Sequence, residues 1–232
     1  QVNHCAVGIT PAALSASWIT KAGWDYSIPT TGSNASFADL DGDSDLDMIS
    51  TGTQNVYGYR NTGTDDNPVW TAFEGWNIGA ATLGYVNPLH TALGDLAQDG
   101  DYDLLLAHQG QAVLAFENTG DAKNAVWTRK SAWDLASGDT VTVNYKIALS
   151  DLTGDGVPEL VVGGLWSSGK MNTYSFNGST WVRQATWDLP GINTAGPKAS
   201  IGDLDGDGDL DALVGGWDEP AKVWLNDGTG TF

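Results

Sequence analysis

Basic residues are scarce in this 232-residue sequence, which has 10 Lys and Arg against 29 Asp and Glu and a formal net charge of −19. No basic patch could offset the charge of phosphate groups, so the composition argues against nucleic acid as a partner. No apolar stretch approaches the roughly 18 residues of a membrane span, and membrane insertion is not expected. The single cysteine, Cys5, cannot form an internal disulfide. We expect a small buried residue there, with a chain-to-chain bridge as the alternative.

Glutamate is also rare, because 25 of the 29 acidic residues are Asp and 4 are Glu. Short carboxylates aimed from tight loops fit this ratio better than helix surfaces do. The sequence has 30 Gly, 11 Trp and many short β-branched or aromatic runs between turn residues, which predicts an all-β fold. The length would allow two small domains, but we expect one domain over residues 1–232.

An aspartate-rich loop occurs four times, as "DLDGDSDLD" (39–47), "DLAQDGDYD" (95–103), "DLTGDGVPE" (151–159) and "DLDGDGDLD" (203–211). The loops start 56, 56 and 52 residues apart and hold 17 of the 29 acidic residues. Carboxylates this close repel one another unless a cation lies among them. The acidity therefore indicates local binding of a hard dication rather than a generally acidic surface.

A second motif has the same copy number: W-x5-W followed by Asp or Asn, at residues 18–25, 70–77, 127–134 and 181–188. Each aspartate loop joins two short apolar runs, a third run follows, and W-x5-W begins a fourth, so each repeat has four predicted strands. Repeats of about 40 to 50 residues with four short strands are typical of β-propeller blades. We expect the tryptophan pairs to pack between blades.

The two motifs are out of phase, because the chain opens with W-x5-W and closes after a loop and two strands. The sequence predicts a four-bladed β-propeller with four-stranded blades, the last completed by the N-terminal strand. The repeats are expected at about 35–90, 91–145, 146–197 and 198–232 plus 1–34. The segment from Trp18 to Tyr26 is the expected outer strand. The N-terminal strand could also complete the last blade of another chain, which would give a head-to-tail polymer or an eight-bladed ring of two chains.

The repeated loops, each followed by an apolar strand and then by turns such as "NTGT" or "NDGT", resemble the FG-GAP/VCBS-type repeats. This family includes the integrin α-subunit propeller, fungal integrin-like lectins and many secreted bacterial proteins. The resemblance covers nearly the whole chain. It implies a β-propeller with a structural Ca²⁺ in the loop between the first two strands of a blade, in an extracellular, secreted or cell-surface protein.

Calcium takes six to eight oxygen ligands, which carboxylates at loop positions 1, 3, 5 and 9 and a backbone carbonyl at position 7 can supply. The predicted ligands of the first and fourth loops, ranked best, are Asp39, Asp41, Asp43, Asp45 and Asp47, and Asp203, Asp205, Asp207, Asp209 and Asp211. The third loop offers Asp151, Thr153, Asp155, Val157 and Glu159. The second offers Asp95, Asp99, Asp101 and Asp103 but has Ala97 at position 3, and we rank it weakest. An EF-hand is rejected, because it needs flanking helices and an acid at position 12, where these loops have Ser50, Leu106, Val162 and Val214.

No catalytic constellation is evident, since the three histidines are scattered and no nucleophile or phosphate-binding motif occurs, so we expect no enzyme. Trp166 and Trp217 lie in predicted turns between the second and third strands of a blade, opposite the aspartate loops. With Asp218, and with His108 at the corresponding turn of another blade, they are candidates for stacking on and hydrogen-bonding to a sugar. Local packing or a protein contact is the alternative for these tryptophans. The resulting hypothesis is a lectin-like carbohydrate-binding module; the alternative is an extracellular structural or adhesive subunit that binds protein or itself.

Overall fold

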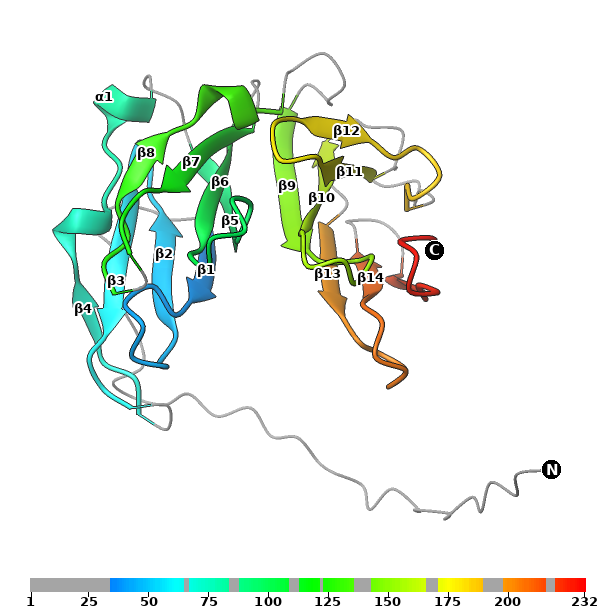
Figure 1. The fold of residues 1–232 in the computed structure, drawn as a ribbon, viewed down its shortest axis with the longest axis horizontal. Coiled ribbons are helices and arrows are strands. Elements are labelled where there is room, and N and C mark those ends of the chain that lie inside the picture. The colour runs from blue at the N-terminus through cyan, green and yellow to red at the C-terminus, as the bar shows by residue number, and fades with distance from the viewer. Residues whose placement is uncertain are drawn as a thin grey trace.

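A computed structural model describes residues 34–64, 67–83, 88–108, 113–121, 123–135, 143–165, 171–189, 198–215 and 220–232. The described residues form four antiparallel sheets that follow one another in chain order (Figure 1). Each sheet is a blade, so the predicted all-β, four-bladed β-propeller is confirmed. Helical structure in the described residues is limited to α1 (Ala80–Leu83) and the 3-10 turns η1 (Glu74–Trp76) and η2 (Ser131–Trp133). None of these segments has the length and apolar character that crossing a membrane demands.

Three blades have four described strands and the last has three. The first blade contains β1 (Ala35–Ala38), β2 (Asp47–Thr51), β3 (Val56–Asn61) and β4 (Trp70–Ala72). The second contains β5 (Pro88–Gly94), β6 (Asp103–His108), β7 (Leu114–Asn118) and β8 (Trp127–Arg129). The third contains β9 (Val143–Ser150), β10 (Glu159–Leu165), β11 (Asn172–Phe176) and β12 (Trp181–Arg183). The fourth contains β13 (Lys198–Gly202), β14 (Asp211–Gly215) and β15 (Lys222–Trp224), and its predicted completing strand, Trp18 to Tyr26, lies outside the described residues.

The first strand of every blade is its inner strand. Neighbouring inner strands contact each other from β1 to β5, from β5 to β9 and from β9 to β13. Residues of these four strands line one open channel of about 590 Å³. Between β13 and β1, the inner strands of the last and first blades, the described residues make no contact as extensive as these three.

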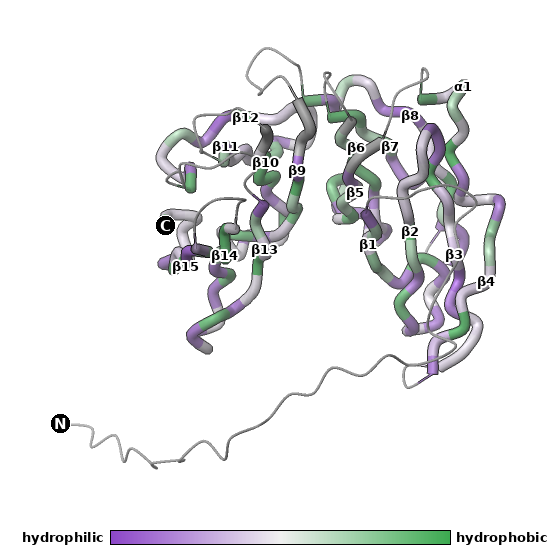
Figure 2. Tube along the Cα trace, turned by 180° about the vertical axis from the view of Figure 1, so that it is seen from behind, coloured by the Kyte–Doolittle hydropathy of each residue, from purple (hydrophilic) through white to green (hydrophobic). Residues whose placement is uncertain are grey.

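The hydrophobic core lies in the three interfaces between successive blades. Side chains of the second strands alternate between two interfaces: Leu104 and Leu106 of β6 face the first blade, while Leu105 faces the third. All three leucines are fully buried. This explains why "DLLLAH" and "ELVVGG" read as continuous apolar runs, because both faces of these strands are covered. Figure 2 shows the hydrophobic colouring along β5, β6 and β10, in the middle of the molecule.

The W-x5-W motif joins the first blade to the second and the second blade to the third. Its first tryptophan starts the fourth strand, and its indole N–H donates to the backbone carbonyl of the second tryptophan of the preceding blade. These bonds run from Trp127 Nε1 to Trp76 O at 3.2 Å and from Trp181 Nε1 to Trp133 O at 2.8 Å. Trp76 and Trp133 are buried at the ends of η1 and η2. Trp76 with Trp127, and Trp133 with Trp181, thus pack between blades, as the sequence predicted for the tryptophan pairs.

The Asp or Asn that follows the motif has a defined role. Its side-chain oxygen accepts the hydrogen bond of a backbone N–H in the third strand of the same blade. The pairs are Gly58 N to Asn77 at 2.9 Å, Ala115 N to Asp134 at 2.9 Å and Thr173 N to Asp188 at 3.1 Å. The crossing segment therefore satisfies a polar group that the sheet leaves unpaired.

Gly58 shows how tightly the second tryptophan packs. A Cβ atom at this position would lie 2.3 Å from Trp76 Cβ. We expect Gly58→Ala to destabilise the protein by about 1–3 kcal/mol, because β3 and η1 must move apart. Chemical denaturation of the variant measures the effect.

Gly202→Ala is the matched control for this change. Nothing lies within 4 Å of a Cβ built on Gly202, and Ala38 occupies the same register position in the first blade. The control should change stability by less than about 1 kcal/mol. Equal losses in the two variants would contradict the close contact between Gly58 and Trp76.

Candidate functional site

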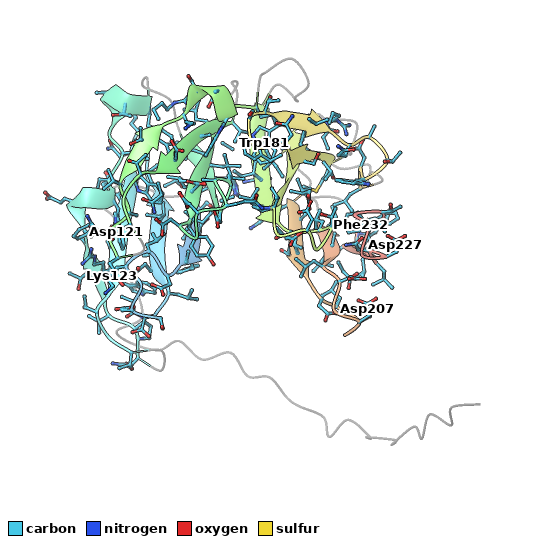
Figure 3. The ribbon with its side chains drawn as sticks, in the orientation of Figure 1. Asp121, Lys123, Trp181, Asp207, Asp227 and Phe232 are labelled. Carbon is cyan, nitrogen blue, oxygen red and sulfur yellow. The ribbon has the colours of Figure 1, made fainter. Side chains whose placement is uncertain are left out.

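The four aspartate loops join the first and second strands of their blades at one end of the molecule, and Figure 3 labels Asp207 in the fourth. The carboxylate at position 1 shapes each turn by accepting two backbone N–H bonds. In the first loop, Asp39 accepts from Gly42 N at 2.7 Å and from Ser44 N at 3.0 Å. In the fourth loop, Gly206 and Gly208 have φ values of 83° and 99°, which favour glycine.

The carboxylate at position 9 fixes the loop to its blade. Asp47, at the start of β2, accepts from Leu40 N and from Asn61 N, both at 2.9 Å. Asp103 and Asp211 make the corresponding bonds in their blades, and Glu159 accepts from Leu152 N at 2.7 Å. Burial raises the pKa of Asp47 and of Asp103 to about 6 and the pKa of Glu159 to about 7. A nearby cation would offset this by favouring the ionised carboxylates.

Two of the loops bring three carboxylates together. Oxygens of Asp39, Asp41 and Asp43 lie within 4.8 Å of one another, as do oxygens of Asp203, Asp205 and Asp211. Among the described residues, these are the groups of three or more His, Cys, Asp or Glu side chains close enough to hold a metal ion. They belong to the first and fourth loops, which the sequence ranks highest as ligand sets. The binding of an ion itself stays a prediction.

Asp41 carries a further sign that its loop suits a cation. Its Oδ1 atom is buried and has no hydrogen-bond partner, while Oδ2 lies 3.5 Å from Arg60 Nε. Burial and the neighbouring carboxylate of Asp43 raise the pKa of Asp41, and the Arg60 charge only partly opposes them. A metal ion would supply both a partner for the orphan oxygen and the missing positive charge.

The second and third loops do not form such a group of three carboxylates among the described residues. In the second, Ala97 offers no side-chain oxygen at position 3, and its backbone N–H donates to Asp103 at 3.0 Å. In the third, the Thr153 hydroxyl lies 3.4 Å from a carboxylate oxygen of Glu159. The remaining predicted ligands are Asp95, Asp99 and Asp101 in the second loop and Asp151, Asp155 and Val157 in the third.

A cavity of about 250 Å³ lies between the first and second loops. Its lining includes Asp39, Gly42, Gly100, Asp101, Tyr102 and Asp121. Tyr102 is an exposed aromatic ring among polar groups, which is a suitable lining for a small polar ligand. The sequence reasoning missed this cavity, because it forms only when the two loops meet.

The predicted sugar-binding positions follow strand ends at the opposite end of the blades. Trp166, Trp217 and Asp218 lie outside the described residues, and His108 is described only as the last residue of β6. What the structure describes are the strand ends from which these turns leave. β10 ends at Leu165 and β14 at Gly215, in adjacent blades.

A row of polar residues that sequence reasoning missed lies at this same end. Asn34, His90, Lys146 and Lys198 each stand five residues before the first aspartate of their loop, in or beside the four inner strands. His90 is buried, and its Nε2 atom lies 2.5 Å from Lys146 Nζ. Burial, with the charges of Lys146 and Lys198, lowers the pKa of His90 to about 3. Burial and the charge of Lys198 also lower the pKa of Lys146.

The comparisons with known proteins agree with this architecture. Residues 151–214, from the third aspartate loop to β14, match the model of an FG-GAP-like repeat. No curated protein matches the chain. A solved lectin from Agrocybe aegerita, described as recognising non-reducing terminal N-acetylglucosamine, is similar in fold, with a TM-score of 0.56 and 23% identity. The match covers 84% of this chain and 49% of the lectin, so this chain spans about half of its length.

Two other structures share less of the shape. The Tc holotoxin pore of Photorhabdus luminescens has a TM-score of 0.45 and 23% identity over 89% of this chain and 9% of that one. The exotype rhamnogalacturonan lyase YesX has a TM-score of 0.44 and 14% identity over 80% of this chain and 39% of that one. The repeated loops and the four sheets identify the chain as a four-bladed β-propeller, in which residues 151–214 match an FG-GAP-like repeat.

Proposed function

We propose that this protein is an extracellular carbohydrate-binding module whose propeller is stabilised by Ca²⁺. The observation that carries the proposal is that two tryptophans follow equivalent strand ends in adjacent blades. β10 and β14 lie in adjacent blades and end at Leu165 and Gly215, on the side away from the aspartate loops, and Trp166 and Trp217 follow these strand ends in the sequence. Two indole rings beside polar groups match the usual way in which proteins bind sugar rings. The fold similarity to an N-acetylglucosamine-binding lectin supports the same reading.

Calcium has a structural role in this proposal. The oxygens of Asp39, Asp41 and Asp43, and of Asp203, Asp205 and Asp211, are hard ligands of the kind that calcium prefers. The ion would neutralise the crowded carboxylates and fix each loop between its two strands. These loops lie at the end of the blades opposite to the strand ends Leu165 and Gly215, which precede the two tryptophans, so the ion is not expected to touch the sugar.

A glycan-binding experiment tests the carbohydrate proposal. The protein is applied to immobilised glycans that include terminal N-acetylglucosamine, and the double variant Trp166→Ala/Trp217→Ala is compared with the unchanged chain. We expect glycan binding by the unchanged chain and a loss of at least tenfold in the double variant, since stacking contributes on the order of 1 kcal/mol per ring.

Tyr102→Ala serves as the control, because this ring lies in the cavity between the first two aspartate loops. Binding that survives the tryptophan changes but is lost in Tyr102→Ala would place the sugar in that cavity instead. An unchanged chain that binds no glycan would overturn the proposal.

A structural or adhesive role is the second candidate, and one observation favours it. Leu213, Val223 and Leu225 form an exposed apolar patch on the last described sheet. The N-terminal segment of a second copy of the chain could cover this patch in place of the chain's own segment, which would give a head-to-tail polymer. Concentration-dependent polymerisation of a chain that binds no glycan would support this role.

A further inference from the structure

The inner strands gather positive charge in a strongly acidic molecule. Lys146 and Lys198 occupy the same register position in β9 and β13, and these strands contact each other. Neither lysine makes an ion pair with a described carboxylate, whereas Arg60, Arg129, Lys130 and Arg183 all do. Two neighbouring ammonium groups repel each other, and an anion between them would relieve that repulsion.

The hydrogen-bonding capacity of these groups is not used up. Lys146 donates one N–H to the neutral ring of His90, and an ammonium group has three to donate. His90 is buried and comes from the neighbouring strand β5, so it holds the Lys146 amine in one position. Lys198 is exposed and belongs to the same row. An anionic group could therefore accept hydrogen bonds from both amines.

The two lysines also pair with residues near the strand ends that precede the tryptophan positions. Lys146 pairs with Gly163 near the end of β10, and Lys198 pairs with Gly215, the last residue of β14. The turns that carry Trp166 and Trp217 begin just after these strand ends. A sugar in contact with those turns would bring its substituents near the two amines.

We propose that Lys146 and Lys198, with His90 positioning Lys146, form an anion subsite for an acidic saccharide. This inference rests on the carbohydrate-binding function proposed above and names its substrate class. The shared chemistry is an anionic substituent on a sugar ring, either a carboxylate or a sulfate. Both accept charge-assisted hydrogen bonds from ammonium groups.

Titration calorimetry with three forms of one oligosaccharide tests the proposal. The probes are oligogalactose, its C6-oxidised form oligogalacturonate and a sulfated oligogalactose, each titrated into the full chain. The acidic forms should bind more tightly than the neutral form, and Lys198→Gln should weaken the acidic forms by about tenfold or more. The neutral form should bind equally to both proteins. The relative affinities of the carboxylated and sulfated forms identify the anion.

Lys123→Gln is the matched control. It removes the same charge from an exposed lysine in the turn between β7 and β8, away from the inner strands (Figure 3). Equal losses in Lys123→Gln and Lys198→Gln would show an effect of net charge and would overturn the subsite. Neutral and acidic forms that bind equally would also overturn it while leaving the carbohydrate function intact. If none of the three probes binds while the immobilised glycans do, the subsite is overturned alone; if the immobilised glycans do not bind either, the proposed function fails as well.

Lys146→Gln tests the second lysine of the subsite, which is half-buried. It should weaken the acidic forms at least as much as Lys198→Gln, because Lys146 is held in place by His90. Melting curves of all variants check that each is folded. A folded Lys146→Gln variant with unchanged affinity for the acidic forms would remove this residue from the subsite.

Discussion

A chain that lacks residues 1–26 should aggregate or unfold under conditions in which the full chain stays folded and monomeric. The reason lies on the free face of the last described sheet. Leu213 is 39% exposed, whereas the residues at the same register position in the other blades, Ile49, Leu105 and Val161, are at most 1% exposed. Its cross-strand partner Val223 is 54% exposed. Uncovered apolar side chains beside an unpaired strand edge favour aggregation.

The other blades show what covers this face. In each, the segment after the fourth strand places its second tryptophan beside the third strand and accepts a backbone N–H from it, as Asn77 does from Gly58 N. Residues 18–25 carry the same motif, with Trp24 and Asp25 at the equivalent positions. We therefore expect Trp24 to cover Leu213 and Val223, and Asp25 to accept the N–H of Val223.

Sedimentation and thermal melting of the truncated chain measure the effect. A chain without residues 1–16 is the matched control, since it keeps the whole motif and should behave like the full chain. Added peptide 17–33 should partly restore the melting temperature of the truncated chain. Closure within one chain is favoured over closure between chains, because the intramolecular partner has the higher effective concentration. A full chain with the mass of a dimer would instead favour the eight-bladed ring. A truncated chain that stays monomeric and melts like the full one would contradict closure by this segment.

The blades and loops were predictable because each feature repeats in the sequence. Four copies of D-x-x-x-D and W-x5-W set the number of blades, and the continuous run Leu104 to Leu106 indicates a strand buried on both faces. The sequence also ranked the first and fourth loops highest, from the number of their carboxylates alone. In the structure, the three-carboxylate groups lie in these two loops.

Contacts between repeats were not predictable in the same way. The bond from Trp127 Nε1 to Trp76 O joins residues 51 positions apart, and nothing in a single repeat indicates it. The row of His90, Lys146 and Lys198 is hidden because the residues differ in type, and only their shared register relates them. The sequence treated His90 as one scattered histidine, whereas its partner comes from the next blade. Interfaces between blades depend on side-chain identity at a register position, which the repeat pattern does not specify.

Calcium should raise the melting temperature of the full chain by about 5–10 °C per well-occupied site, relative to the chain in excess chelator. An ion that binds only the folded chain stabilises it by mass action, by about 2.7 kcal/mol at a concentration one hundred times its dissociation constant. Without the ion, Asp39, Asp41 and Asp43 lie within 4.8 Å of one another with the Arg60 guanidinium as the one described ion-pair partner of this group. Calorimetric melting in calcium and in chelator measures the difference, and an unchanged melting curve would refute calcium binding.

Asp205→Ala should remove a large part of this calcium increment, because Asp205 belongs to one of the two three-carboxylate groups. Ala97→Ser is the matched control at the same loop position, in the second loop, where a carboxylate is already lacking and the backbone N–H is bound to Asp103. The control should keep the full increment. Asp41→Asn should act like Asp205→Ala, since the buried Oδ1 of Asp41 is the oxygen that lacks a partner. Equal losses at positions 97 and 205 would contradict the ranking of the loops, because the effect of calcium would then not depend on how many carboxylates each loop brings together.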